Sequence, residues 1–501
     1  MPPISKPGMS LIAVFAVGAL VLAGCSSAPE ESGAEEQPAV SVPTPVAIAD
    51  GPGLADAITE DAMVAHLEEL EAIASAHDGN RAAGTSGYDA SVDYLRGKLE
   101  AAGFEVQTPE FEFDQFSVET ESLSVGEQDV PVAALTYSPS TPDGGLTARV
   151  LAAPTDDSPG CEATDYDGLD VSGAIVVVDR GVCPFGTKQA VAADLGAVAM
   201  VVVNNEPGPL DGATLGDADI AQIPTGGVSQ EDGPAVAAAP ELTLTLDTET
   251  VTTTSRNVIA QTKTGDTDNV VVAGAHLDSV LEGPGINDNG TGVAAVLESA
   301  LQLGAEPDVT NAVRFAFWGA EELGLVGSSK YVESLSEEDA SNIALYLNFD
   351  MIGSPNAGYL AYDGDDSDQV GAPAGPSGSD AIERMFVERL QAEGIAAGGT
   401  DFDGRSDYGP FIAVGIPAGG VFSGADDVKT PEQAEEWGGI AGEAFDENYH
   451  TPEDTLANVD REALARNASV VGFGIGTYAQ SVDGPNGVPV DEGRIAARSG
   501  Q

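Results

Sequence analysis

Positive charge is scarce in this chain of 501 residues. Lysine and arginine together number 19, against 82 aspartate and glutamate residues, so the formal net charge is −63 at pH 7. Phosphates repel such a chain, which excludes non-specific binding to nucleic acid and disfavours docking on anionic lipid through a basic patch. Hydrophobic residues still make up 42% of the chain, enough for a sizeable core. We therefore expect two or three folded domains with a strongly solvated acidic surface.

Long apolar runs are also scarce. Residues 9–23 form one after Lys6, but the run is short for a membrane span and is typical of a signal-peptide core. It ends in Leu22-Ala23-Gly24-Cys25, which resembles the bacterial lipobox. The resemblance implies a signal peptide over residues 1–24, lipid on Cys25 and anchoring to the outer face of the cell membrane, with release to the extracellular space left open. An ordinary cleaved signal peptide is the alternative.

Cysteine occurs three times. If Cys25 carries lipid, Cys161 and Cys183 remain, and an exported protein lies in an oxidising compartment. Two cysteines cannot form a zinc site alone, and neither lies near a matching histidine. We predict one disulfide between them.

The sequence before residue 130 predicts a tether, then two helices, then a strand. Residues 25–55, rich in Ser, Ala, Glu, Gly and Pro, predict a flexible tether. Residues 61–76 and 86–102 have helical periodicity, with Ser86 as the expected cap of the second helix. Residues 104–113 alternate like a strand.

Residues 130–248 are rich in short β-branched runs and Gly/Pro turns. A strand-like segment, Gly173-Ala174-Ile175-Val176-Val177-Val178-Asp179, precedes a helix at 187–195 and a strand at 198–203. This order resembles the protease-associated domain, a β-rich insert of several exopeptidase families. The resemblance implies no catalytic role; a lid over the substrate and a passive insert both remain open.

From Ser255 onward, apolar strands alternate with helices. The expected strands span residues 269–275, 312–318 and 343–349, the helices 291–303, 380–392 and 462–479, with an apolar stretch at 413–422. This pattern predicts an α/β fold with a mostly parallel central sheet flanked by helices. The α/β domain would comprise residues 56–129 and 249–482, the β-rich insert residues 130–248, and residues 483–501 a frayed tail.

Charged and imidazole side chains follow each of these strands. In such sheets, ligands bind outside the carboxyl ends of the strands. Two more candidates lie on loops, one of them flanked by glycines. The candidates are His276, Asp278, Asp288, Glu321, Glu322, Asp350 and His450.

Two imidazoles and several carboxylates at one sheet edge predict a divalent-metal site, and mixed nitrogen and oxygen ligands suit zinc. Two metals about 3.5–4 Å apart need a bridging carboxylate. Asp288, on its glycine-flanked loop, is free to approach both. Cobalt or manganese could occupy the same ligands.

The ordered set resembles the secreted bacterial di-zinc leucine aminopeptidases and the zinc exopeptidase family around them. The motifs are Ala275-His276-Leu277-Asp278-Ser279, Gly285-Ile286-Asn287-Asp288-Asn289-Gly290, Trp318-Gly319-Ala320-Glu321-Glu322-Leu323-Gly324, Asn348-Phe349-Asp350-Met351 and Tyr449-His450-Thr451. The likeness runs from about residue 76 to 479, interrupted by the insert. It implies two Zn²⁺ per chain, and calcium is left open.

The resemblance also implies a role for each residue. His276 and Asp350 would bind one zinc, Glu322 and His450 the other, and Asp288 would bridge them. Asp278 would hydrogen-bond the imidazole of His276. Glu321 would accept a proton from the attacking water and return it to the leaving amine, and Tyr449 would donate to the oxyanion.

Two further segments concern the substrate. Asp403-Gly404-Arg405-Ser406-Asp407 resembles the family's segment with a substrate-contacting arginine, although Arg405 could instead pair with Asp403 or Asp407. Residues 415–425, small and apolar, resemble a wall of the specificity pocket and suit a Leu-like side chain. No cysteine flanks Tyr449, so the disulfide that secreted relatives often carry there is missing.

We therefore expect a surface-anchored, monomeric metallo-aminopeptidase that acts on peptides with a free N-terminus. A carboxypeptidase or dipeptidase on the same scaffold, with Arg405 on a terminal carboxylate, is one alternative. A non-catalytic receptor-like lipoprotein is another, disfavoured because all five expected ligands and Glu321 are present.

Overall fold

The computed structural model describes residues 50–154, 158–210 and 212–499. The signal peptide, Cys25 and most of the expected tether lie outside these residues. The tether prediction is wrong at its end, because Gly51–Ala57 forms helix α1, capped by the Asp50 side chain. Leu54 of α1 is fully buried. None of the described helices is long and apolar enough to cross a membrane.

The central sheet has eight strands in the order β1-β10-β12-β11-β13-β16-β14-β15. Its four middle strands, β12, β11, β13 and β16, are parallel, and the pairs β1–β10, β10–β12 and β14–β16 are antiparallel. The mostly parallel sheet is thus confirmed in its middle, with mixed edges. The strands are β1 Val106–Gln107, β10 Val258–Gln261, β11 Asp266–His276, β12 Asn311–Trp318, β13 Ile343–Phe349, β14 Leu360–Tyr362, β15 Gly398–Thr400 and β16 Ala418–Phe422.

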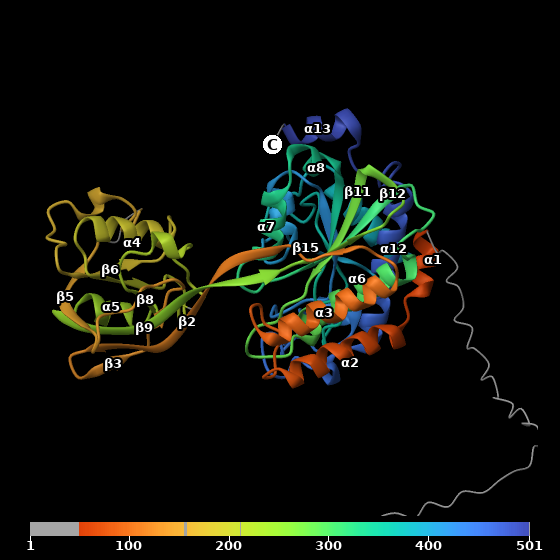
Figure 1. The fold of residues 1–501 in the computed structure, drawn as a ribbon. Helices are drawn as coiled ribbons and strands as arrows, with labels where there is room; N and C mark the ends of the chain where they lie inside the picture. The colour runs from red at the N-terminus through yellow and green to blue at the C-terminus, as the bar shows by residue number, and fades with distance from the viewer. Residues whose placement is uncertain (1–49, 155–157, 211, 500–501) are drawn as a thin grey trace, which may run out of the picture. The chain divides into compact units, whose positions relative to one another are not determined.

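Helices cover both faces of this sheet, because its inner strands are apolar on both sides. Along β11, Val271 and Ala273 belong to one core cluster and Val270 and Val272 to the other. The first cluster includes residues of α2 Glu60–Ala76, α3 Ser86–Ala101, α6 Gly292–Leu303, α9 Ser379–Ala392 and α12 Arg461–Gln480. The second includes residues of α7 Val326–Ser334 and α10 Tyr408–Ala413. In Figure 1, α7 lies on one side of the central strands and α2, α3 and α6 lie on another. Two short helices, α8 Glu337–Asn342 and α11 Pro431–Trp437, complete this part.

A second eight-stranded sheet contains the predicted β-rich insert, in the order β3-β2-β9-β5-β6-β7-β8-β4. Its longest strands, β2 Glu110–Val125 and β9 Glu241–Arg256, form an antiparallel ribbon. The others are β3 Gln128–Val130, β4 Ala133–Ala134, β5 Leu146–Ala152, β6 Ile175–Asp179, β7 Ala199–Val203 and β8 Thr225–Val228, with helices α4 Phe185–Asp194 and α5 Gly233–Ala237. A disulfide joins Cys161 to Cys183.

Several local expectations are corrected. The cap of α3 is Thr85, whose hydroxyl accepts the amide of Tyr88, and Ser86 is already helical. The expected strand at 104–113 is split into β1 and β2, and Pro109 between them lacks the amide that a continuous strand needs. The apolar stretch at 413–422 holds the end of α10 and then β16. The expected tail contains helix α13, Asp491–Ser499.

Candidate metal centre

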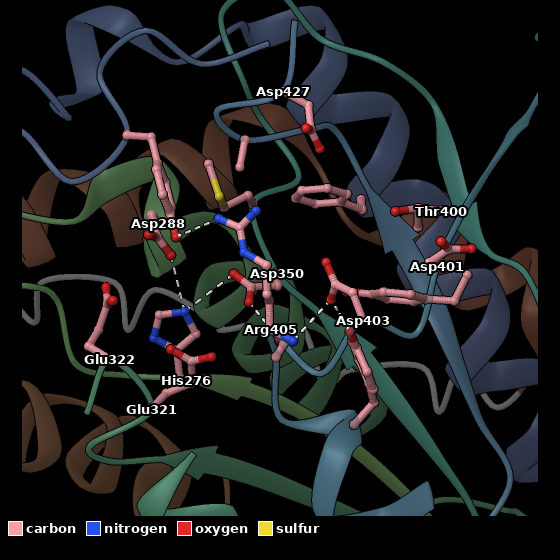
Figure 2. Close-up of a pocket in the computed structure, with 17 residues that line it drawn as sticks. His276, Asp288, Glu321, Glu322, Asp350, Thr400, Asp401, Asp403, Arg405 and Asp427 are labelled. Atoms are coloured by element: carbon pink, nitrogen blue, oxygen red, sulfur yellow. Dashed lines mark hydrogen bonds and ion pairs between the residues drawn. The ribbon is translucent and has the colours of Figure 1, made fainter. Parts of the chain in front are cut away.

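The metal-binding candidates meet at the carboxyl edge of the parallel strands. His276 ends β11, Asp350 follows β13, and Glu321 and Glu322 lie in the turn after β12. Figure 2 shows these side chains pointing toward one another around Asp288. Asp288 lies in the turn Ile286–Thr291 that leads into α6.

The turn that carries Asp288 begins at Gly285, which has φ +62°. A Cβ atom there would lie 2.4 Å from the carbonyl oxygen of Asp288. Only glycine therefore allows the chain to fold back on itself at this point.

The five predicted ligands form two groups that share Asp288. In the first, His276 Nε2 lies 3.1 Å from Asp288 Oδ1 and 3.3 Å from Asp350 Oδ1. In the second, His450 Nε2 lies 3.1 Å from Asp288 Oδ2 and 2.9 Å from Glu322 Oε2. Each carboxylate oxygen of Asp288 thus faces a different imidazole, which is the arrangement expected of a bridging ligand.

The buried acids draw protons onto the imidazoles. Burial lowers the pKa of His276, but Asp350 and Glu321 outweigh it and raise that pKa well above its ordinary value. Burial likewise opposes the shift at His450, where hydrogen bonds to Asp288 and Glu322 raise the pKa to about 10. The clustered carboxylates therefore need a neighbouring positive charge, which a proton or a metal ion can supply.

The donor set fits zinc. Within each group the nitrogen and oxygen donor atoms lie within 4.8 Å of one another, so one ion could contact all three. The other oxygen of Glu322, Oε1, is buried without a hydrogen-bond partner, as an atom reserved for an ion would be. His276, Asp288 and Asp350 would hold one Zn²⁺, and Asp288, Glu322 and His450 a second.

Glu321 lies beside this cluster and is 8% exposed. Burial raises the pKa of its carboxyl group well above the ordinary value, and the neighbouring Asp407 and Glu322 add to this against the opposing charge of His276. A raised pKa is what a carboxylate needs in order to accept a proton near neutral pH.

Asp278 contacts the His276 imidazole through its backbone rather than through its carboxylate. Its carboxylate oxygen lies 3.8 Å from His276 Nδ1, beyond hydrogen-bond range, and its backbone carbonyl lies 3.1 Å from that nitrogen. The carboxylate accepts instead the amides of Glu321, at 3.2 Å, and Glu322, at 3.4 Å. Asp278 therefore aligns the imidazole through its backbone and the Glu-Glu turn through its side chain.

Arg405 and Tyr449 lie together at the mouth of the cluster. Arg405 Nη2 is 2.9 Å from Asp426 Oδ1 and 3.4 Å from the Tyr449 hydroxyl. The Arg405 side chain thus pairs with Asp426, whereas Asp403 accepts the backbone amide of Arg405 and the hydroxyl of Tyr408. The Tyr449 ring stacks on His450 with ring centroids 3.8 Å apart.

Several supporting residues were missed by the sequence analysis. The Ser406 hydroxyl donates to Asp350 Oδ2 at 2.6 Å. Asp454 accepts the amides of Asn287, at 2.7 Å, and Asp288, at 3.0 Å. Asp446 accepts from the Asn287 side chain at 2.7 Å. The last two carboxylates anchor the His450 loop, which has no disulfide, to the Asp288 turn.

Arg81 is the other missed residue, and it is fully buried. Its side chain donates to the carbonyls of Leu277, Pro284 and Gly285, which flank both ends of the loop between β11 and the Asp288 turn. A polar loop before α3 was the only signal for it in the sequence.

A pocket opens from the metal cluster. Its apolar lining comes from Met351, Tyr362, Phe422 and Ala425, of which the last two belong to the predicted wall at 415–425. Three carboxylates that the sequence analysis did not anticipate also line it, at Asp401, Asp403 and Asp427 (Figure 2). The lining thus combines apolar side chains with several carboxylates.

A third cluster of potential ligands contains Asp363, Asp365 and Glu383, and it has no imidazole. The amides of Ser367 and Asp368 donate to the Asp363 carboxylate. These hydrogen bonds account for its position without an ion.

The sheet, the two imidazoles and the shared carboxylate define a metal-dependent hydrolase of the α/β class. Residues 257–473 match peptidase family M28, and residues 146–236 match the PA domain. The chain is 52% identical over 485 residues to the "Probable lipoprotein aminopeptidase LpqL" of Mycobacterium tuberculosis, covering 96% of each chain. It is 42% identical over 447 residues to an aminopeptidase of Pseudomonas aeruginosa, covering 86% of this chain and 83% of the relative.

Solved structures of aminopeptidases are also similar to this chain. An aminopeptidase from Aneurinibacillus sp. strain AM-1 matches with a TM-score of 0.69 and 27% identity, over 85% of this chain and 95% of that one. A zinc aminopeptidase from Bacillus subtilis matches with a TM-score of 0.60 and 26% identity, over 86% and 98%. The chain belongs to peptidase family M28 and carries a PA domain. The predicted family and enzyme class, a zinc aminopeptidase, are confirmed.

Proposed function

We propose that this protein is a surface-anchored aminopeptidase that uses two zinc ions to remove large apolar residues from peptide N-termini. The observation that carries the proposal is the pair of ligand groups that share Asp288, with the buried Glu321 beside them. Relatives named leucine aminopeptidase 2 in Trichophyton, 42% identical over 428 residues, support a leucine preference.

Zinc ions held by these groups would acidify a water molecule and polarise the scissile carbonyl. The protein itself supplies the proton transfer. Glu321 accepts a proton from the attacking water and returns it to the leaving amine. Because Asp278 holds the amides of Glu321 and Glu322, both side chains remain aimed at the same point.

The remaining side chains orient the substrate. Carboxylates of Glu321 and Asp350 hold the free α-amine, and the first side chain enters the pocket beside Met351 and Phe422. The Tyr449 hydroxyl donates to the oxyanion that develops at the carbonyl. Arg405 lies within reach of that hydroxyl and helps to fix its direction.

The enzyme experiment is hydrolysis of Leu-p-nitroanilide by the purified protein, after chelation and after zinc is restored. We expect the chelator to abolish release and zinc to restore it. A Glu321→Gln protein should bind as much zinc as the parent and lose roughly 10²–10⁴-fold in kcat, the range for a removed general base.

No release from any aminoacyl-anilide by folded, zinc-loaded protein would refute the proposal. Peptides with a blocked N-terminus and a free C-terminus are then the next substrates, because a carboxypeptidase would cleave them. The pairing of Arg405 with Asp426 weighs against that alternative, since this arginine already has an anionic partner.

Anchoring rests on the Leu22-Ala23-Gly24-Cys25 motif, which lies outside the described residues, and on the lipoprotein named among the relatives. We expect the protein to partition into detergent and to incorporate labelled fatty acid in cells. A Cys25→Ala variant should do neither. An unlabelled parent chain would show that the signal peptide is of the ordinary cleaved type.

A further inference from the structure

A second hollow opens beside Glu322, apart from the pocket of Figure 2. We call it the leucine hollow, and residues that line it include Ala83, Gln115, Val280, Leu281, Glu322 and Leu323. It measures about 220 Å³, whereas a single water needs only about 10–15 Å³. The leucine hollow can therefore receive a side chain.

Two large apolar side chains are exposed at this hollow. Leu281 is 55% exposed and Leu323 is 42% exposed. They lie on the loops after β11 and β12, the loops that carry Asp278 and Glu322. Adjacent exposed leucines at one concave place beside an active site are typical of a surface that a ligand covers.

The leucine hollow borders the catalytic cluster. Glu322 lines both the leucine hollow and the pocket of Figure 2. In Figure 2, Thr400 and Asp401 lie at the opposite end of the view from Glu321 and Glu322. The leucine hollow shares Glu322 with the pocket and no other lining residue, so it has none in common with the end at Thr400 and Asp401.

The positions of the pocket and the metal cluster determine where the second residue of a bound peptide lies. With the first side chain in the pocket and the first carbonyl at the metal cluster, the chain must continue away from the pocket. The next Cα atom lies only about 3.8 Å further along, so the second residue of the substrate arrives beside Glu322.

We propose that the leucine hollow is the subsite for the second residue of the peptide and that it favours an apolar side chain there. The inference rests on the proposed aminopeptidase function and extends it to the residue after the cleaved bond. Leu281 and Leu323 lose water against that side chain. The exposed carboxylate of Glu282, also at this hollow, repels an acidic one.

The test compares Leu-Leu, Leu-Gly and Leu-Asp as substrates of the zinc-loaded full-length enzyme, by the rate of free leucine release. Burying one leucine side chain predicts a kcat/KM for Leu-Leu roughly tenfold above that for Leu-Gly. Most of the difference should lie in KM. Leu-Asp should be the poorest substrate.

Leu281→Ser and Leu323→Ser should each lower the ratio of kcat/KM for Leu-Leu over Leu-Gly toward one. Both positions are exposed, so neither variant removes a core residue. Ile495→Ser is the matched control, because Ile495 is a 61% exposed residue of α13 that lines neither cavity. It should leave the ratio unchanged.

Two outcomes would overturn the inference, and they distinguish failure of the subsite alone from failure of the aminopeptidase function. If leucine is released equally well from Leu-Leu and Leu-Gly, and neither leucine variant changes the ratio, the subsite is wrong and the aminopeptidase function stands. If no leucine is released from any dipeptide or from Leu-p-nitroanilide, the proposed function fails, and the subsite fails with it.

Discussion

Asp288 occupies the centre of the metal cluster because each of its carboxylate oxygens faces a different imidazole. Burial alone would raise its pKa, yet hydrogen bonds from His276 and His450 hold that pKa well below the usual range. The side chain therefore stays anionic under all ordinary conditions. In the proposed two-zinc site, Asp288 would contribute one carboxylate oxygen to each ion.

Replacing Asp288 should therefore affect both ions together. We expect Asp288→Asn to lower bound zinc from two equivalents to less than one, measured by atomic absorption after dialysis, and to reduce kcat/KM at least 10³-fold. Asp350→Asn, which changes one group only, should keep close to one equivalent. Two equivalents retained by Asp288→Asn would contradict the bridging role.

Asp454 acts one step further out, since it binds the amides of Asn287 and Asp288 rather than an ion. Asp454→Asn should weaken zinc binding by about 10–100-fold, as loss of a supporting partner does. Excess zinc should restore kcat. The neighbouring exposed Glu453→Gln is the control, and an unchanged zinc affinity in Asp454→Asn would show that the turn holds without it.

At the scale of elements, α13 shows how a polar segment can be part of the fold. Arg494 on this helix is 4% exposed, and it donates to the carbonyls of Asp268 and Ser341 and to the side chain of Asn269. The helix thereby ties the start of β11 to the end of α8. Its charged composition predicted only a frayed tail.

Arg494→Ala should remove three part-buried hydrogen bonds made by a guanidinium that is itself buried. We expect a loss of about 2 kcal/mol in the free energy of unfolding and a melting temperature lower by a few degrees. Hydrolysis of Leu-p-nitroanilide at 25 °C should be unchanged, because α13 supplies no residue to the metal centre. Glu492→Gln, an exposed change on the same helix, should alter neither, and equal stability of the two variants would refute the role of Arg494.

The contrast between strands and loops explains what could be predicted. The strands β11, β12 and β13 were predicted from apolar runs, and the rule that parallel strands end at one edge brought His276, Glu321 and Asp350 together. Contacts between loops, in contrast, leave no periodic pattern of apolar residues in the sequence. The hydrogen bonds from Ser406 to Asp350 and from Asn287 to Asp446 join distant loops, and no spacing in the sequence indicates them.

At the scale of the whole molecule, the metal cluster joins segments that are far apart in the sequence, from His276 to His450. Without an ion, protons take its place. Burial raises the pKa of Glu322 to about 7. At His450, burial is outweighed by the hydrogen bonds to Asp288 and Glu322, so that the pKa reaches about 10.

Stability of the metal-free protein should therefore depend on pH. A group whose pKa is higher in the folded state contributes stability below its unfolded value, and this is lost as the pH rises through the folded value. For His450 the window runs from about 6.5, the unfolded pKa, to about 10. We expect the chelated protein to melt at a lower temperature at pH 9 than at pH 6.

Zinc should flatten this dependence, because it replaces the proton between the imidazole and the two carboxylates. Thermal melts with chelator and with zinc, at pH 6 and pH 9, measure the effect. His450→Ala should lose most of the difference between the two pH values, whereas His77→Ala, with an exposed imidazole bonded to Ser86, should behave like the parent. Equal melting temperatures of the chelated parent at both pH values would mean that solvent or other cations already neutralise the cluster.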